Sequence, residues 1–203
     1  MKGNNRKSKK GFTLIELLVV IAIIAILSVV VILTLNPAEL LRQSRDSNRV
    51  SDLSVTKSAI AFYLASVSSP TIESSTELCH FSGITTGTNP LNGTSSCAWF
   101  ATLAAGATTT LRGNFRTVDG NGWIWINFNS ITAGGSPLAQ LPVDPLNTGD
   151  NYYTYTASNT TLQFKLATHM ESAKYAAGGS GDVVTTDGGT SASSYEQGTN
   201  LSL

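Results

Sequence analysis

One carboxylate lies inside a long apolar run near the start of the 203-residue chain. Glu16 is followed by residues without a polar side chain from Leu17 to Leu27. A carboxylate inside a membrane-spanning helix costs on the order of a few kcal/mol, and by default it has a partner and a function. Cleavage after Gly11 would give Phe12 a free α-amino group four residues before Glu16. That amine would be a cation for the carboxylate of the same or a neighbouring copy; the alternative is a carboxylate that simply reaches the lipid head groups.

The apolar run that carries this carboxylate is long enough to cross a bilayer as a helix. It covers residues 12–35 and continues past Ser28 and Thr34, which is about 36 Å of helix. A secretory signal would have a shorter apolar core followed by small residues at a cleavage site, and residues 32–36 contain no such site. A plain signal anchor that is never processed remains an alternative.

Positive charge is concentrated before this run. Residues 1–11 form a basic leader with five of the 13 Lys and Arg residues of the chain. These five are Lys2, Arg6, Lys7, Lys9 and Lys10. The positive-inside rule places the leader in the cytoplasm and the remainder of the chain outside. Without the leader, 8 basic and 13 acidic residues remain, a net charge of −5, so we predict no specific nucleic-acid partner.

The order of these features resembles a known export and assembly signal. Lys-Lys-Gly-Phe-Thr-Leu-Ile-Glu at residues 9–16, followed by the apolar run, is similar to the class III signal of type IV pilins and type II secretion pseudopilins. The resemblance implies cleavage by prepilin peptidase between Gly11 and Phe12 and N-methylation of Phe12. It also implies that Glu16 pairs with the N-terminal amine of an adjacent subunit during assembly.

The same resemblance implies a fold and a set of partners. The expected fold class is α+β, the type IV pilin fold, in which a long N-terminal α-helix packs on a small antiparallel β-sheet. The expected partners are other copies in a helical filament, prepilin peptidase, the inner-membrane assembly platform, and the lipid bilayer before assembly.

The helical pattern resumes after a break at Pro37. Proline disfavours helix at the preceding residue, so a kink is expected there, and an amphipathic helix is expected over residues 36–69. Its apolar residues recur with helical spacing at Val50, Leu53, Ile60, Leu64 and Val67. The charged stretch at residues 45–53 resembles the region where many pilins enter the globular domain. A solvated helix face with local ion pairs is the alternative.

Residues 70–203 are expected to form the globular domain, which begins with a variable segment. Residues 71–120 are rich in Thr, Ser, Gly and Asn and are predicted to be a loop with one short helix at residues 98–103. The chain has two cysteines, Cys79 and Cys97, and the space outside the cytoplasm permits their oxidation. A disulfide between them is therefore expected. A metal-binding pair that includes the neighbouring His80 is the alternative.

The predicted strands come later in the chain, with the sheet at about residues 122–168. Residues 122–128 are aromatic and β-branched, and residues 152–156 and 162–167 are predicted to form a hairpin. The Leu-Pro-x-Asp-Pro turn at residues 141–145 resembles pseudopilins and related bacterial pilins. Residues 178–203 are predicted to be a flexible tail from their glycine-rich composition.

Two aspartates of that tail are the candidates for a metal site. Asp182 and Asp187 supply hard oxygen ligands that suit calcium, although acidic glycine-rich loops are usually only solvated. No other cofactor is predicted. Three glycosylation patterns begin at Asn92, Asn159 and Asn200, as expected by chance in a chain so rich in Thr and Asn.

Catalytic motifs are missing from the sequence. The two histidines, His80 and His169, have no spacing that suggests a base with a partner. The sequence contains no phosphate loop, no paired CxxC and no HExxH. We therefore predict a non-enzymatic protein.

The expected function is a structural subunit of a type IV pilus. It would span the inner membrane once with its globular domain outside, and would then join an extracellular filament for adhesion, motility or DNA uptake. A type II secretion pseudopilin is the first alternative, which a true calcium site would favour. The second is a membrane-anchored minor pilin that acts as a tip adhesin or binding module.

Overall fold

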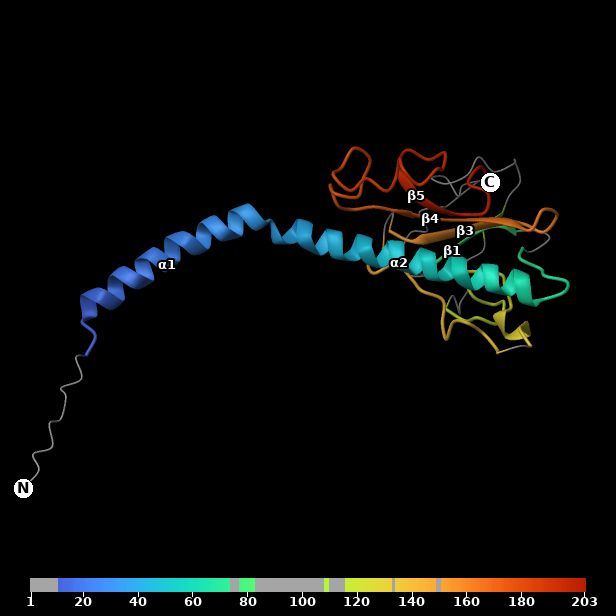
Figure 1. Ribbon diagram of the computed structural model, residues 1–203, viewed down its shortest axis with the longest axis horizontal. Coiled ribbons are helices and arrows are strands. Elements are labelled where there is room, and N and C mark those ends of the chain that lie inside the picture. Colours follow the sequence, from blue (N-terminus) through green and yellow to red (C-terminus); the bar gives the residue numbers. More distant parts are fainter. Residues whose placement is uncertain (1–10, 74–76, 83–107, 110–115, 133, 149–150) are drawn as a thin grey trace, which may run out of the picture. The chain divides into compact units, whose positions relative to one another are not determined.

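The protein is described by a computed structural model at residues 11–73, 77–82, 108–109, 116–132, 134–148 and 151–203. It divides into two compact units, Met1–Leu40 and Leu41–Leu203, which we describe separately. The second unit is called the head below. The structure is α+β, with an apolar helix, a second helix and a small, mainly antiparallel sheet (Figure 1). This is the fold class predicted from the sequence, and it is consistent with the pilin fold.

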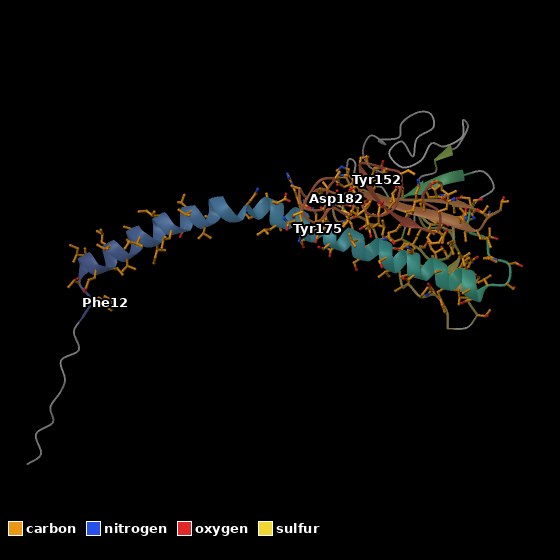
Figure 2. All side chains as sticks on the ribbon, turned by 45° about the horizontal axis from the view of Figure 1, so that its top comes forward. Phe12, Tyr152, Tyr175 and Asp182 are labelled. Carbon is orange, nitrogen blue, oxygen red and sulfur yellow. The ribbon has the colours of Figure 1, made fainter. Side chains whose placement is uncertain are left out.

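Helix α1 spans Leu14–Leu35 and is apolar on all sides. Its large apolar side chains from Leu14 to Ile32 are exposed, and Phe12 lies just before its start (Figure 2). The Ser28 hydroxyl donates a hydrogen bond to the Ile24 carbonyl at 2.7 Å, so this polar group is satisfied within the helix. Within the described part of the chain, Leu14–Ile32 is the one segment long and apolar enough to cross a membrane.

The two helices are separated by one residue in the left-handed conformation. Asn36 has φ 39° and ψ 75° and caps the C-terminus of α1. Helix α2 begins at Pro37 and spans Pro37–Ser66. Proline suits this first helical position because the N–H that it lacks would have no helical acceptor there. The Asn36 carbonyl and side-chain oxygens both accept hydrogen bonds from the Glu39 N–H.

Within the head, α2 supplies one side of the hydrophobic core. Leu53 and Ile60 are fully buried, and Ala59 and Tyr63 are nearly so. Val50, Leu64 and Val67 pack against the same core while partly exposed. The apolar positions identified from helical spacing therefore do face the core. The helix ends at Ser66, just before Pro70.

The sheet has five strands in the order β2-β1-β3-β4-β5. The strands are β1 (Glu77–Phe81), β2 (Thr108–Thr109), β3 (Tyr153–Ser158), β4 (Gln163–His169) and β5 (Ser194–Gly198). β3 and β4 form an antiparallel hairpin, β1 and β5 flank it antiparallel, and the short β2 runs parallel to β1. The hairpin corresponds to the strands predicted at 152–156 and 162–167, and its turn is closed by Leu162 at φ 53°.

The strand predicted at residues 122–128 does not form. This segment is irregular, with one isolated bridge between Asp119 and Asn127 and a single 3₁₀ turn, η1, at Phe128–Ser130. The prediction was wrong because the consecutive residues Trp123 and Ile124 are both buried, whereas successive side chains of a half-exposed strand point to opposite faces. Trp123, Ile124 and Ile126 are all buried, so the segment fills the core instead of extending the sheet.

Aromatic contacts connect this irregular segment to both other parts of the core. Trp123 lies 6.1 Å from Tyr153 of β3, and Phe128 packs edge-on against Tyr63 of α2 at 5.9 Å. The Trp123 indole N–H donates to the Pro142 carbonyl at 2.9 Å, which satisfies its polar atom. Glycine is required at position 122, where a Cβ would collide with the Thr117 carbonyl and the Leu141 side chain.

The prediction of a flexible tail over residues 178–203 was also wrong. Its last part forms β5, which pairs with β4 along five residues. Glu196 of β5 and Lys165 of β4 form a buried ion pair at 3.2 Å. The second oxygen of Glu196 accepts hydrogen bonds from the Thr190 and Ser191 N–H groups at 2.8 and 3.0 Å. Hydrogen bonds from backbone N–H groups to carboxylates thus hold this glycine-rich segment in one conformation. Its composition alone does not predict these bonds.

One side chain of the hairpin turn holds the chain that follows α2. The Asn159 Oδ1 atom accepts from the N–H groups of Ile72 and Glu73 at 2.8 and 3.0 Å, and its Nδ2 donates to the Glu73 carbonyl at 2.6 Å. The amide that would accept a glycan is therefore already bonded within the head. This is a structural role for a residue whose sequence pattern suggests a glycosylation site.

We predict that Asn159→Ala destabilises the head by about 2 kcal/mol, because two backbone N–H groups lose their acceptor. Thermal unfolding of the detergent-solubilised chain, followed by tryptophan fluorescence, measures this change. Thr160→Ala in the same turn is the matched control and should stay within about 0.5 kcal/mol of the wild type. Equal stability of the two variants would contradict this role of Asn159.

Candidate functional site

The carboxylate of Glu16 accepts hydrogen bonds from Thr13, the residue that caps the N-terminus of α1. Its Oε2 accepts hydrogen bonds from the Thr13 N–H at 2.8 Å and the Thr13 hydroxyl at 2.7 Å. The Glu16 N–H returns a bond to the Thr13 hydroxyl at 3.3 Å, which completes a capping box. In apolar surroundings these bonds would satisfy part of the hydrogen-bonding capacity of the carboxylate.

The surroundings of Glu16 are apolar. Phe12, Ile15, Val19 and Val20 line a shallow hollow of about 390 Å³ beside it. An apolar side chain of another molecule would fit this hollow, and a cation beside it would lie close to the carboxylate. The arrangement suits pairing of Glu16 with a charge from another copy.

The bond between Gly11 and Phe12 is accessible. Gly11 and Phe12 precede the helix, and the Phe12 side chain is 90% exposed. Nothing lies within 4 Å of the position that a Cβ of Gly11 would occupy. A peptidase can therefore reach this bond without unwinding α1, and the amine that it frees would lie within one helical turn of Glu16.

Comparison with known families supports this interpretation of the N-terminus. Residues 6–32 match the prokaryotic N-terminal methylation motif. The chain carries the class III signal of type IV pilins and pseudopilins. Comparison with curated proteins and with solved structures gave no match.

The methylation motif marks a pilin-like or pseudopilin precursor. It indicates a structural subunit rather than an enzyme, and it implies processing by prepilin peptidase and assembly into pilus-like polymers. The exposed apolar segment Leu14–Ile32 fits the membrane anchoring that such a precursor requires.

A second polar centre lies inside the head of this pilin-like chain, around Arg49. The guanidinium is fully buried and binds Asp144 through two bonds, from Nε at 2.6 Å and from Nη2 at 3.0 Å. Its Nη1 donates to Asp46 and to Glu171, each at 2.7 Å. We call Asp46, Arg49, Asp144 and Glu171, with Arg45, the ion cluster.

The ion cluster connects three distant parts of the chain. Arg45 and Arg49 come from α2 and Asp144 from the Leu-Pro-x-Asp-Pro turn. Glu171 lies two residues after the end of β4. Arg45 donates two hydrogen bonds to the Glu171 carboxylate, from Nε at 2.7 Å and from Nη2 at 3.1 Å. The cluster therefore fixes the register of α2 against the loop and the sheet.

Two carboxylates of the cluster, those of Asp46 and Asp144, also accept hydrogen bonds from backbone N–H groups. Asp46 accepts from the N–H groups of Glu171 and Ser172 at 3.0 and 2.8 Å. Asp144 accepts from the Leu146 and Asn147 N–H groups at 2.9 and 3.2 Å. Backbone donors and the guanidinium together satisfy these buried oxygens, as a buried ion network requires.

The electrostatics of the cluster favour its charged forms. Burial disfavours a charged guanidinium, but the hydrogen bonds and charges of Asp144 and Glu171 outweigh it and raise the pKa of Arg49. Burial would likewise raise the pKa of Glu171, yet the hydrogen bonds from Arg45 and Arg49 hold that pKa below its ordinary value. Both groups are ionised at neutral pH.

The charged stretch at residues 45–53 is thus not a solvated helix face. Asp46 and Arg49 have no exposed surface, and Asp52 accepts a hydrogen bond from the Tyr153 hydroxyl at 2.7 Å. The alternative of a solvated face with only local ion pairs is wrong for these residues. Their spacing of three put Asp46, Arg49 and Asp52 on one helix face, a signal that could have indicated a common buried partner.

The predicted disulfide lies outside the described residues, whereas the two histidines are placed in the head. Cys79 lies in β1, but its side chain and the whole of Cys97 lie outside the described residues, so the disulfide stays a prediction. His80 is buried, and its Nε2 lies 2.8 Å from the Glu73 carboxylate. The His80 ring stacks on Trp125 at 6.3 Å and so belongs to the core. His169 ends β4.

The two calcium candidates bind backbone groups of their own turns. Asp182, labelled in Figure 2, accepts from the Gly178, Val184 and Thr185 N–H groups and from the Thr185 hydroxyl. The Thr185 bonds are the main reason that its pKa falls to about 2. Asp187 accepts from the Gly189 and Glu196 N–H groups. Among the described residues, no group of three or more metal-ligating side chains converges.

We predict that Arg49→Met lowers the free energy of unfolding of the head by about 3–5 kcal/mol, because Asp46 and Asp144 stay buried without their cation. Urea unfolding of the full chain in detergent, followed by tryptophan fluorescence, measures the loss. Arg42→Met, at an exposed position of the same helix, is the matched control with a change below about 0.5 kcal/mol. A loss in Arg49→Met no larger than in the control would show that the cluster does not stabilise the head.

Proposed function

We propose that this chain is the precursor of a type IV pilus subunit. Prepilin peptidase cuts it between Gly11 and Phe12, the new N-terminus is methylated, and the mature chain polymerises into a surface filament. The observation that carries the proposal is the placement of Glu16. It is the one carboxylate in a 22-residue apolar helix, and it lies four residues after Phe12, whose bond to Gly11 is exposed.

The capping box of Glu16 gives the subunit a stable state before assembly. In the membrane, Thr13 supplies two hydrogen bonds to the carboxylate. During assembly, the methylated amine of a neighbouring Phe12 adds a charge that Thr13 lacks, and an ion pair in apolar surroundings is stronger than a neutral hydrogen bond. Glu16 thereby sets the register between subunits.

Transfer of α1 from lipid to a filament core needs little change in hydrophobic free energy. All large apolar residues of its spanning segment are exposed in the single chain, and lipid tails are as apolar as neighbouring helices. Cleavage also removes the five positive charges of the leader, which would otherwise hold the N-terminus on the cytoplasmic side.

A type II secretion pseudopilin is the second candidate. The Leu-Pro-x-Asp-Pro turn, whose Asp144 is part of the ion cluster, is compatible with it, because this turn resembles those of pseudopilins and related bacterial pilins. A minor pilin that acts as a tip adhesin would share all of these features and would differ in its copy number within the filament.

Glu16→Ala is expected to insert normally into the membrane and to lose filament assembly, since register pairing fails while the apolar helix is intact. Filaments sheared from cells and subunits in the membrane fraction are quantified by immunoblot. Glu39→Ala removes a carboxylate from the first turn of α2 and is the matched control. Wild-type amounts of filament from Glu16→Ala would contradict the assembly role.

Intact mass of the protein in sheared filaments tests the proposed function as a whole. We expect a dominant species that lacks residues 1–11 and is one methyl group heavier than the unmodified remainder. A processed species confined to the membrane fraction would favour the pseudopilin, and a trace amount among other subunits would favour the minor pilin. An unprocessed chain would show that the segment is a plain signal anchor.

A further inference from the structure

Two stretches of chain that are far apart in the sequence meet at the end of the head where α2 begins. Arg45 binds Glu171, and the Ser47 hydroxyl lies 3.2 Å from the Tyr175 hydroxyl, within hydrogen-bond distance. Figure 2 shows Tyr175 next to this part of the helix. The turn at residues 173–180, which we call the end turn, therefore lies beside the start of α2 in the head.

The end turn presents one cation among mostly small residues. Its sequence is Ala-Lys-Tyr-Ala-Ala-Gly-Gly-Ser, and Lys174 and Ala177 are exposed. The Lys174 ammonium lies over the Tyr175 ring, 5.0 Å from its centroid, which favours a position at the surface. Lys57 and Lys165, the other two lysines that the structure describes in the head, bind side chains of β5. In the described part of the chain no carboxylate forms an ion pair with Lys174.

The carboxylates at this end of the head already have donors within the protein. Glu171 binds both Arg45 and Arg49. Asp182 accepts four hydrogen bonds from the turn that it closes. Their negative charge is therefore taken up by the fold, whereas the Lys174 ammonium is available to an anionic group from outside.

Leu41 and Arg42 extend this surface along α2. They lie one helical turn before Arg45 and Asp46, which contact the chain after β4, so they are on the same side of the helix. Leu41 is 63% exposed, and Arg42 is exposed as well; Glu39 precedes them in the first turn of the helix. An exposed apolar side chain beside exposed cations is the composition of a surface that lies on a membrane.

The chain itself keeps this surface near the bilayer when the segment Leu14–Ile32 spans it. Leu41 follows Leu35, the last residue of α1, by six residues, which is about 9 Å of helix. The head groups on each side of the hydrocarbon core occupy roughly 5–8 Å. Whatever the angle between the two helices, lipid phosphates are thus within reach of the start of the head. Because the head is tethered there, even a weak contact with lipid is populated.

We propose that the surface formed by Leu41, Arg42 and the end turn rests on the phospholipid surface of the membrane before assembly. Lys174 and Arg42 bind lipid phosphates, and Leu41 enters the boundary between head groups and acyl chains. The contact orients the head of the unassembled subunit and is lost when the subunit leaves the bilayer. It needs only the membrane anchor and not polymerisation, so it goes beyond the proposed function.

Photocross-linking of the full chain in lipid nanodiscs tests this contact. Benzoylphenylalanine replaces the exposed Ala177 of the end turn. In a control chain it replaces the exposed Thr160 of the β3–β4 turn, which lies beside the chain that follows the other end of α2. In nanodiscs of phosphatidylcholine and phosphatidylglycerol, irradiation should add the mass of one phospholipid at position 177 at least fivefold more often than at position 160. Equal labelling at the two positions, or none at position 177, would overturn the proposal.

Lys174→Gln in the chain with the probe at position 177 tests the cation. We expect at least a threefold loss of lipid adduct, with unchanged nanodisc incorporation and unchanged resistance of the head to protease. Lys57→Gln removes the same charge from α2 and is the matched control, which should label like the parent chain. A lipid adduct that Lys174→Gln leaves unchanged would overturn the role of this ammonium. Lipid labelling of a chain that never polymerises in cells would support the contact and refute the proposed function.

Discussion

The buried guanidinium of Arg49 is the interaction on which the structure of the head depends most. Burial of a cation is costly, and it is tolerated here because Asp144, Asp46 and Glu171 surround it within 2.7 Å or less for each closest pair. These carboxylates come from three separate segments. A head that lost this register would leave charges buried without partners, so the cluster selects one arrangement of α2, loop and sheet among many that hydrophobic burial alone would permit.

The charged residues of α2 within residues 48–65 all have partners in the head. Arg49 binds the carboxylates of the ion cluster, Asp52 accepts from Tyr153, and Lys57 donates to Gln197. The exposed side of the same residues carries Asn, Ser and Ala together with Val55 and Phe62. In α1 the situation is simpler: one carboxylate lies in an apolar helix, and Thr13 donates hydrogen bonds to it.

The N-terminus was predictable from sequence because its signals are local. Gly11, Phe12 and Glu16 lie in one short segment, and the apolar run that follows has no competing pattern. The β3–β4 hairpin was predictable for the same reason. The strand expected at 122–128 was not, since Trp123 and Ile124 are buried together by tertiary packing that overrides their β-propensity. Strand β5 was not predicted because glycine-rich turns precede it. The conformation of these turns depends on hydrogen bonds to Asp182, Asp187 and Glu196.

The ion cluster shows why the second polar centre could not be derived from spacing alone. Asp46 and Arg49 at a separation of three are compatible with a solvated pair, and Asp144 lies 95 residues further along the chain. The decisive fact is burial, which depends on how the Leu-Pro-x-Asp-Pro turn folds over α2. Once Arg49 is buried, each carboxylate near it must be paired or hydrogen-bonded, so the conformation of this turn and the position of α2 in the head are determined together.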